Sequence, residues 1–233
     1  MNNDMNEKIF LFLSLEKTII FALNSKKQDL YKKELSNLDP KIFENSNELN
    51  NFLDKNIFSL EKKLNRFVNN INLIINHDDF FSINLSVKNR FEFKKMDISQ
   101  INNLLLETKN HVKKSLDENE IIHMKINKFV IDGKDYISIP DDIDSSNFFV
   151  EVEFICLPKK LIKNVEKILI NYQISINKIL SYEYLCNFKS NPNENIFIVA
   201  DNILNGLNQN EVFLINKSAK NKGIFEKFFN FFN

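Results

Sequence analysis

Apolar positions in the first third of the chain follow strand spacing, then helix spacing. Residues 8–23 carry two runs of Ile, Phe and Leu that predict two short buried strands, with a turn near 14–17. A third strand is expected near 28–35, and another buried strand at 71–76. Residues 46–68 predict a helix, because apolar residues recur at helical spacing. These apolar helix positions are Leu49, Phe52, Leu53, Leu60, Leu64 and Phe67.

The middle of the chain alternates between strand and helix patterns. The predicted order is strand 80–87, helix 96–116, strand 119–132, strand 136–139, strand 147–157, helix 158–172 and strand 174–180. Asp132 and Gly133 form a tight-turn dipeptide that favours a hairpin between two of these strands. Short turns between successive strands indicate an antiparallel or mixed sheet with its helices on one face.

Together these elements predict an α/β (α+β) protein built from two units and a tail. Residues 7–79, with a helix at 196–207, are expected to form the first unit, and residues 80–181 the second. Residues 208–221 are expected to be a flexible basic linker. Residues 222–233 are expected to form a short amphipathic helix.

The tail concentrates large apolar side chains on one helical face. At about 100° per residue, this face carries Ile224, Phe225, Phe228, Phe229, Phe231 and Phe232. Lys222 and Lys227 supply positive charge beside it. An apolar face with nearby cations is typical of a helix lying in the interface of an anionic membrane. We therefore predict that these eight residues bind the membrane, and that so short a helix folds only on contact with lipid.

Two other interpretations of the tail stay open. Its Phe side chains could pack on the chain's own domain, or they could fill an apolar groove of a partner. A single short anchor binds a membrane weakly, so useful retention would need several copies, through self-association or through a partner.

Composition excludes several classes of function. The 31 basic and 31 acidic residues give a formal net charge of zero, so a general nucleic-acid binder is not expected. Glu16 and Lys17 interrupt the N-terminal apolar stretch, which argues against a signal peptide. No run approaches the roughly 20 apolar residues of a membrane-spanning helix. We therefore expect a cytoplasmic protein that is peripheral on the inner face of the cell membrane.

Candidate chemistry is sparse. His77, His111 and His123 are dispersed, without Cys or His at ligand spacing, so no metal site is expected. His123 lies in a predicted strand and is expected to be structural, and Cys156 is expected to be a small core residue. The sequence has no nucleophile elbow, Walker loop or dinucleotide fingerprint. We expect no enzyme and no cofactor. The alternative is a small enzyme without a motif, which a deep pocket with perturbed acids would favour.

Residues 120–132 resemble a motif of the FtsA family of bacterial actin-like cell-division proteins. In that family an inserted domain carries a segment of the form LH-x-IP-x-x-(F/Y)-x-(I/V)-D. His123, Phe129 and Asp132 stand at the corresponding positions. The order of elements and the tail extend the resemblance over nearly the whole chain. It implies a remnant of the first actin-like subdomain beside the family's inserted domain, with these three residues in structural roles.

The nucleotide loops of that family are missing. Where the family has DIGT in its first phosphate loop, residues 14–18 are Ser-Leu-Glu-Lys-Thr, without a glycine to let phosphates approach the backbone. The second loop, DIGGGT, has no counterpart. After Tyr182 the chain also reaches its tail in far fewer residues than the family uses. The resemblance therefore implies a degenerate, shortened copy without ATP binding.

The function implied by the resemblance is that of a non-enzymatic, membrane-associated adaptor of the cell-division machinery. Its expected partners are the anionic surface of the cytoplasmic membrane and division proteins such as the tubulin-like FtsZ or late divisome components. Self-association is a further expectation. The alternatives are a pilus-assembly adaptor, related to the actin-like protein of type IV pilus machines, and an interaction module without membrane binding.

Overall fold

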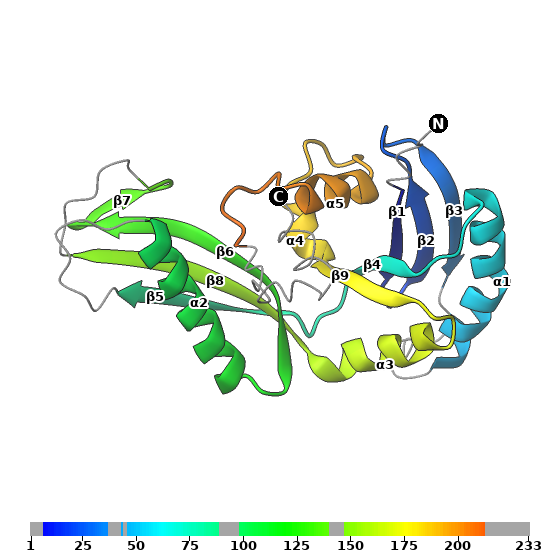
Figure 1. Ribbon diagram of the computed structural model, residues 1–233, viewed down its shortest axis with the longest axis horizontal. Helices are drawn as coiled ribbons and strands as arrows, with labels where there is room; N and C mark the ends of the chain where they lie inside the picture. The colour runs from blue at the N-terminus through cyan, green and yellow to red at the C-terminus, as the bar shows by residue number, and fades with distance from the viewer. Residues whose placement is uncertain (1–6, 37–42, 44–45, 89–97, 140–146, 213–233) are drawn as a thin grey trace, which may run out of the picture.

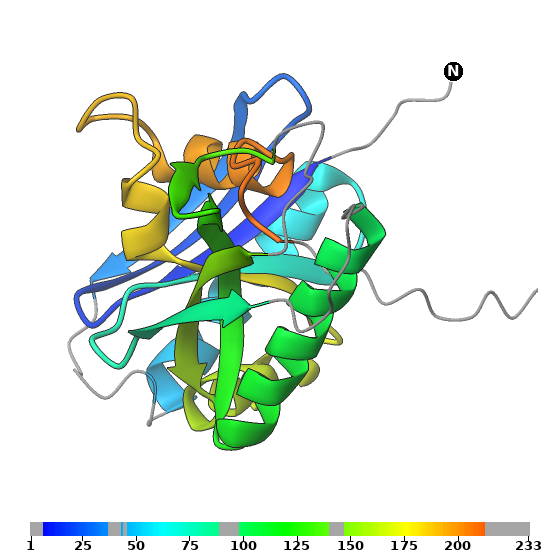
Figure 2. The same ribbon diagram turned by 90° about the vertical axis from the view of Figure 1, so that its left-hand side faces the viewer.

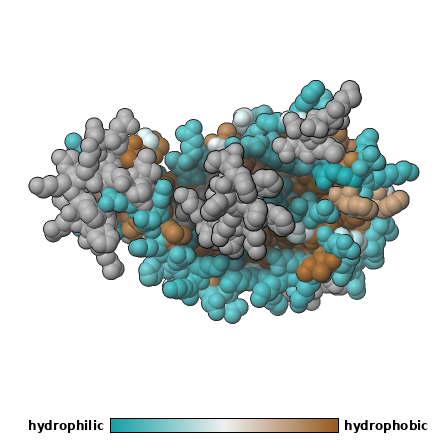
Figure 3. All heavy atoms as spheres, in the orientation of Figure 1, coloured by the Kyte–Doolittle hydropathy of each residue, from teal (hydrophilic) through white to brown (hydrophobic). Residues whose placement is uncertain are grey.

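Two β-sheets lie side by side along the long axis of the molecule (Figure 1). The structure is a computed structural model, and it describes residues 7–36, 43, 46–88, 98–139 and 147–212. The smaller sheet and one helix form one end of the molecule, and the larger sheet with the other helices forms the opposite end. On the face drawn in Figure 3, polar residues make up most of the coloured surface, and apolar residues are visible mainly in the right-hand half.

The larger sheet has five strands in the order β3–β2–β1–β4–β9. The first three form an antiparallel meander, whereas β4 and β9 run parallel to β1. Strands β1, β2 and β4 are buried almost throughout, which explains their continuous apolar runs. The strand bounds are β1 (Lys8–Leu13), β2 (Lys17–Leu23), β3 (Asp29–Ser36), β4 (Asn70–Ile75) and β9 (Ser175–Ser181).

Helices cover both faces of the larger sheet. Leu11 and Leu73 share one core cluster with apolar residues of α1 and α3. Phe10 and Phe21 share a second cluster with α4 and α5 on the opposite face, where the ring of Phe21 stacks on Phe197 at a centroid distance of 4.2 Å. The helix bounds are α1 (Ser46–Leu64), α3 (Lys159–Ile170), α4 (Tyr182–Cys186) and α5 (Ile196–Leu204).

The smaller sheet has four antiparallel strands in the order β5–β8–β6–β7. Helix α2 lies across one face of it (Figure 2), where Ile101 and Leu105 share a core with Val152. Asp132 and Gly133 form the predicted hairpin turn, with φ angles of 49° and 77°. The bounds are β5 (Phe81–Lys88), α2 (Ile98–Ser115), β6 (Asn119–Ile131), β7 (Lys134–Tyr136) and β8 (Phe148–Pro158).

The predicted α/β fold class is confirmed, and most elements lie within a few residues of their expected bounds. The first helix is shorter than predicted. Asn65 takes a left-handed φ of 52°, and the N–H of Arg66 bonds to the carbonyl of Glu61, which ends α1 in a Schellman-type cap. Phe67, expected on the core face of this helix, therefore lies beyond it and is 78% exposed.

Two further elements differ from the expectation. The return strand expected at 136–139 lies earlier, at Lys134–Tyr136, because the turn at Asp132 and Gly133 is immediately followed by pairing. The five-residue helix α4 was not predicted at all. Ser181 starts α4, since its side chain accepts a hydrogen bond from the N–H of Tyr184.

The sheets divide the chain differently from the two predicted units. The sequence assigns residues 80–181 to the second unit, but β9 pairs with β4, and α3 packs in the core of the larger sheet. The inserted sheet therefore ends with β8. Parallel strands need a long crossover between them. Here the whole smaller sheet, together with α3, lies inside the crossover from β4 to β9.

Candidate functional site at the junction of the two sheets

Strand β8 carries the chain back from the smaller sheet toward the larger one, and the first residues of β6 pair with its end (Figure 1). Ile122 of β6 and Leu157 of β8 belong to the same core cluster as the apolar residues of α1 and α3. Strand β8 leads directly into α3, with Pro158 at the helix start, as the sequence predicted. The junction is thus packed as an extension of the larger core, and it does not have the exposed, polar character of an interdomain linker.

His123 lies at this junction on β6, with 1% of its surface exposed. Its Nε2 accepts a hydrogen bond of 3.0 Å from the backbone N–H of Ser181, at the end of β9. The ring proton is therefore on Nδ1, which donates to Oε1 of Glu211 at 2.8 Å. Burial lowers the pKa of His123 and outweighs the opposing effect of Glu211. The imidazole is neutral, so its contact with Glu211 is a charge-assisted hydrogen bond.

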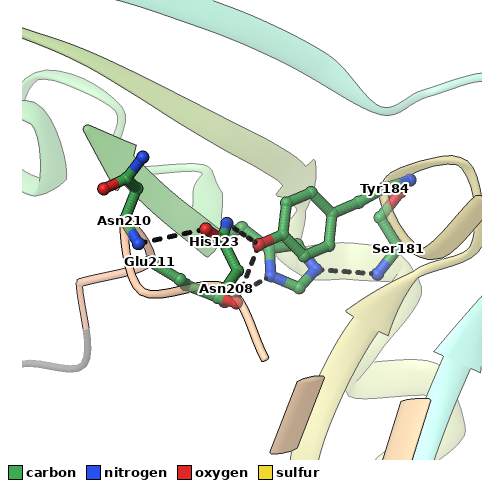
Figure 4. A network of polar contacts seen from close by, with 6 residues as sticks. All are labelled: His123, Ser181, Tyr184, Asn208, Asn210 and Glu211. Carbon is green, nitrogen blue, oxygen red and sulfur yellow. Dashed lines mark hydrogen bonds and ion pairs between the residues drawn. The ribbon is translucent and has the colours of Figure 1, made fainter. Parts of the chain in front are cut away.

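Glu211 joins His123 to a second buried donor (Figure 4). The side chain of Glu211 is 2% exposed, and its Oε2 accepts a hydrogen bond of 2.8 Å from the hydroxyl of Tyr184. That hydroxyl in turn accepts from the amide of Asn208 at 2.8 Å. Burial is the main cause that raises the pKa of Tyr184, so the phenol keeps the proton that it donates. The Tyr184 ring also stacks on the imidazole at 3.9 Å.

Backbone pairing fixes the segment that carries Glu211. The N–H of Ile126 donates to the carbonyl of Asn210, and the N–H of Val212 donates to the carbonyl of Met124, each at 2.8 Å. Residues 208–212 thus form a strap on β6, with a turn that begins at Asn208 and a single bridge between Glu211 and Lys125. This corrects the predicted linker: its first residues are held by a buried carboxylate and by two backbone bonds. Residues 213–221 of the linker lie outside the described residues.

The network has the composition of an acid–base pair but not its geometry. A general base needs a free lone pair within reach of a substrate. The Nε2 lone pair of His123 is engaged by the backbone of Ser181, and the imidazole side chain is fully buried. Within the described ranges no cluster of His, Cys, Asp or Glu could hold a metal ion, and every buried side-chain N or O atom has a partner. The arrangement therefore holds β6, β9 and the strap together.

A groove of about 540 Å³ opens beside the network, between β6, α3 and β9. Its apolar lining is Ile121, Ile122, Ile162, Ile176 and Ile179. Its charged residues are Glu120, Lys159, Lys163, Glu166 and Lys178. Strand β9 is the last strand of its sheet, and no strand in the described part of the chain pairs with its outer side. Apolar pockets beside an open strand edge are features that bind extended peptides.

A further lysine, Lys109, lies near enough to the groove residue Lys178 to be affected by its charge. The pKa of Lys109 on α2 is lowered, first by burial and then by the positive charges of Lys178 and Lys113. The groove itself is lined by three lysines and two glutamates, and Lys159 also lies 4.0 Å from Asp117. A ligand with acidic residues between its apolar ones would complement the lysines of this lining.

The turn between β1 and β2 occupies the place of the first phosphate loop in the resemblance. The hydroxyl of Ser14 accepts hydrogen bonds from the backbone N–H groups of Glu16 and Lys17, at 3.2 and 3.0 Å. The same hydroxyl donates to the carbonyl of Lys17. Phosphate loops bind anions with backbone N–H groups that point outward. In this turn two of those groups are used internally.

The residues singled out by the sequence lie in different places. His123 is in the buried network, Phe129 is 3% exposed in the smaller core, and Asp132 is in the hairpin turn. The eight predicted membrane-binding residues, from Lys222 to Phe232, lie outside the described residues. Among the described residues, no helix is long and apolar enough to cross a membrane.

Sequence reasoning missed Glu211, Tyr184 and Asn208. Glu211 is 88 positions from His123 and belongs to no motif of the sequence. The one local signal was the apolar run that begins at Val212, directly after Glu211.

Comparison with known proteins gives only distant structural likenesses. No family model matches the chain, and no curated protein matches its sequence. The cytoplasmic domain of EpsL, an inner membrane component of the type II secretion system of Vibrio cholerae, is similar with a TM-score of 0.34 and 10% identity. That match covers 77% of this chain and 57% of EpsL.

Two other solved structures are similar to a comparable extent. A Bacteroides thetaiotaomicron protein with an actin-like ATPase fold and unknown function has a TM-score of 0.31 at 16% identity, covering 77% of this chain and 53% of its own. The PilM–PilN type IV pilus biogenesis complex has a TM-score of 0.42 at 7% identity, covering 76% and 48%. The chain thus spans about half the length of these proteins. The specific resemblance to FtsA stays a prediction.

Proposed function

We propose that this chain is a non-enzymatic adaptor that binds an extended segment of a partner protein in the groove between β6, α3 and β9. The observation that carries the proposal is the groove itself, where an open strand edge meets an apolar lining with a charged rim. Main-chain bonding to a strand edge supplies affinity, and alternate side-chain pockets supply specificity. The expected ligand is an extended peptide with apolar residues at strand spacing and acidic residues between them.

The geometry near the groove supports a binding role over a catalytic one. His123 and Glu211 are both buried; they bond to each other, and His123 also accepts a bond from the backbone of Ser181. Ser14 closes the turn that would face a nucleotide. A nucleotide would therefore have to break this turn before the backbone could reach its phosphates.

The setting that we propose is the inner face of the cytoplasmic membrane, in a cell-division assembly of the FtsA type. The motif at 120–132 and the Phe-rich tail with its lysines support this setting. Under this proposal the groove binds a division protein, such as FtsZ or a late divisome component, and the tail holds the complex at anionic lipid. The alternative is an adaptor of a pilus-assembly machine, which would use the same groove for a different partner.

Site-specific photo-crosslinking tests the groove. A photo-reactive amino acid replaces Lys163, an exposed residue of the groove on α3. The matched control replaces Lys33, an equally exposed lysine on β3 at the opposite edge of the sheet. Crosslinking in the native host to a division protein from position 163, and not from 33, supports the proposal. Crosslinking to a pilus-assembly protein supports the alternative, and equal patterns from both positions contradict a role for the groove.

Sedimentation with anionic liposomes tests the membrane setting separately. The full chain is compared with a version that ends at Lys217 and with the double variant Phe228→Asp, Phe232→Asp, each with and without purified FtsZ. We expect only the intact chain to pellet, because the charged replacements remove the apolar face. If FtsZ pellets with it, the chain is a direct tether; if the intact chain stays soluble, the tail is not a membrane anchor. The groove is judged by the crosslinks alone.

A further inference from the structure

The four edges of the two sheets differ in how open they are to a further strand. Strand β7 has only three residues, and β9 borders the groove. Strand β3 carries several charges, and its pairing with β2 contains a register shift between Ala22 and Leu23. Strand β5 instead has eight residues, pairs with β8 at every position without a shift, and contains a single charge, Lys88. A long, regular edge with little charge is a template for pairing with another chain.

The apolar side of β5 is also incompletely covered. Ile83, Leu85 and Val87 point into the smaller core but stay half-buried. Val150 and Val152, their neighbours on β8, are fully buried at 0% exposure. The remaining exposure of β5 is therefore that of an edge strand, and one more strand beside it would cover these three side chains. No strand in the described ranges occupies this place.

We propose that β5 pairs antiparallel with β5 of a second copy of this chain, which joins two smaller sheets into one continuous sheet across a two-fold axis. Directly opposed residues in an antiparallel pair lie on the same face. The apolar residues of β5 must therefore oppose apolar residues of the second copy. This condition is met only when the two-fold axis passes through the position of one residue and not between two residues. The two such registers nearest the middle of β5 place either Asn84 or Leu85 on the axis.

A second copy fits this edge because the strand complements itself. With Leu85 on the axis, Ile83 opposes Val87, and Lys88 opposes the hydroxyl of Ser82. With Asn84 on the axis, Ile83 opposes Leu85, and Ser82 opposes Ser86. Neither register brings like charges together, which would weaken the pair. Both are isologous contacts that close as a dimer and do not extend into a fibre.

The pairing should be weak in solution. A single pair of strands covers much less area than the roughly 1,600 Å² of a standard interface. Under the proposed function, confinement at the membrane would raise the local concentration, and each dimer would carry two tails. Two weak anchors on one particle bind far more tightly than one. The dimer would therefore supply the several copies that a short anchor requires.

Sedimentation equilibrium of the full chain tests the proposal, over protein concentrations up to about 1 mM. The key variant is Asn84→Lys, Ser86→Lys, on the exposed face of β5. In either register this variant places lysines opposite each other: Lys at 84 meets itself, or it meets Lys at 86. The control is Asn84→Thr, Ser86→Thr, which keeps the positions neutral and suits a strand. Far-UV circular dichroism checks that every variant is folded.

The wild type and the threonine control should show a monomer–dimer equilibrium, and the lysine variant should dimerise at least about tenfold more weakly. High salt should restore part of its dimerisation by screening the repulsion. A wild type that is monomeric at every concentration overturns the proposal. A lysine variant that dimerises as well as the wild type overturns it too, since another surface is then responsible. Neither outcome bears on the groove, which the crosslinks test independently.

Discussion

Replacement of Glu211 by alanine should lower the free energy of unfolding by about 3–5 kcal/mol. The carboxylate accepts hydrogen bonds from His123 and Tyr184, both at 2.8 Å, and its side chain is 2% exposed. Each hydrogen bond to a buried charge contributes about 1.5–3 kcal/mol. After the replacement, the Nδ1–H of His123 and the hydroxyl proton of Tyr184 would be left buried without an acceptor. The loss would be a large part of the stability of an ordinary domain.

Two further variants test whether the loss of stability comes from the hydrogen bonds of Glu211 or from replacing any glutamate in this region. Glu211→Gln keeps the size but offers one acceptor to two donors, so we expect a smaller loss of about 1–3 kcal/mol. Glu183→Ala, at an exposed glutamate next to Tyr184 on α4, should change stability by less than about 0.5 kcal/mol.

The assay is urea unfolding followed by far-UV circular dichroism, because the chain has no tryptophan for fluorescence. Hydrogen exchange adds a local measurement. The amide of Val212, which bonds to the carbonyl of Met124, should exchange much faster in the Glu211→Ala variant than in the wild type. If that variant unfolds within about 1 kcal/mol of the wild type, the carboxylate does not hold the strap, and the reasoning fails.

Three other predictions concern single groups. Because burial lowers the pKa of His123, the free energy of unfolding should be highest above the ordinary histidine pKa of about 6.5, and below that pH it should fall by up to about 1.4 kcal/mol per pH unit. In urea titrations from pH 8 to 5, the variant His123→Gln should lose this slope and His111→Gln should keep it. Burial raises the pKa of Cys156 to about 11, so a thiol reagent should modify Cys186 in the folded protein and Cys156 only on unfolding; equal rates would contradict this. Gly133→Ala should cost about 1 kcal/mol in thermal melts, because Gly133 has a φ of 77° and no atom crowds the new methyl group; an unchanged melting temperature would show that the turn relaxes.

Local patterns predicted most of the elements because the cause of each element is local. The hairpin between β6 and β7 was predicted because the dipeptide Asp132-Gly133 has a conformational requirement of its own. The end of α1 was missed for a local reason that apolar periodicity does not report. Asn65 takes a left-handed conformation that stops the helix before Phe67.

Pairings between distant segments were beyond local patterns. The boundary at 181 failed because β9 returns to pair with β4, across about a hundred residues that form their own sheet. Glu211 was assigned to a linker because the residues directly before it are polar, as is usual in loops. Its burial depends on His123 and Tyr184, whose positions are fixed only after both sheets have formed.

Strand β6 links the groove, the buried hydrogen-bond network and the strap. Ile122 of β6 lines the groove, His123 is bonded to β9 and to Glu211, and Met124 is bonded to the strap. Since β6 is held on both sides by buried bonds, it cannot shift to admit a ligand without breaking them. The groove is therefore preformed. Most of the conformational entropy lost on binding would be lost by the partner peptide and not by this chain. The variant Glu211→Ala, which frees one side of β6, should then weaken partner binding without altering any residue that lines the groove.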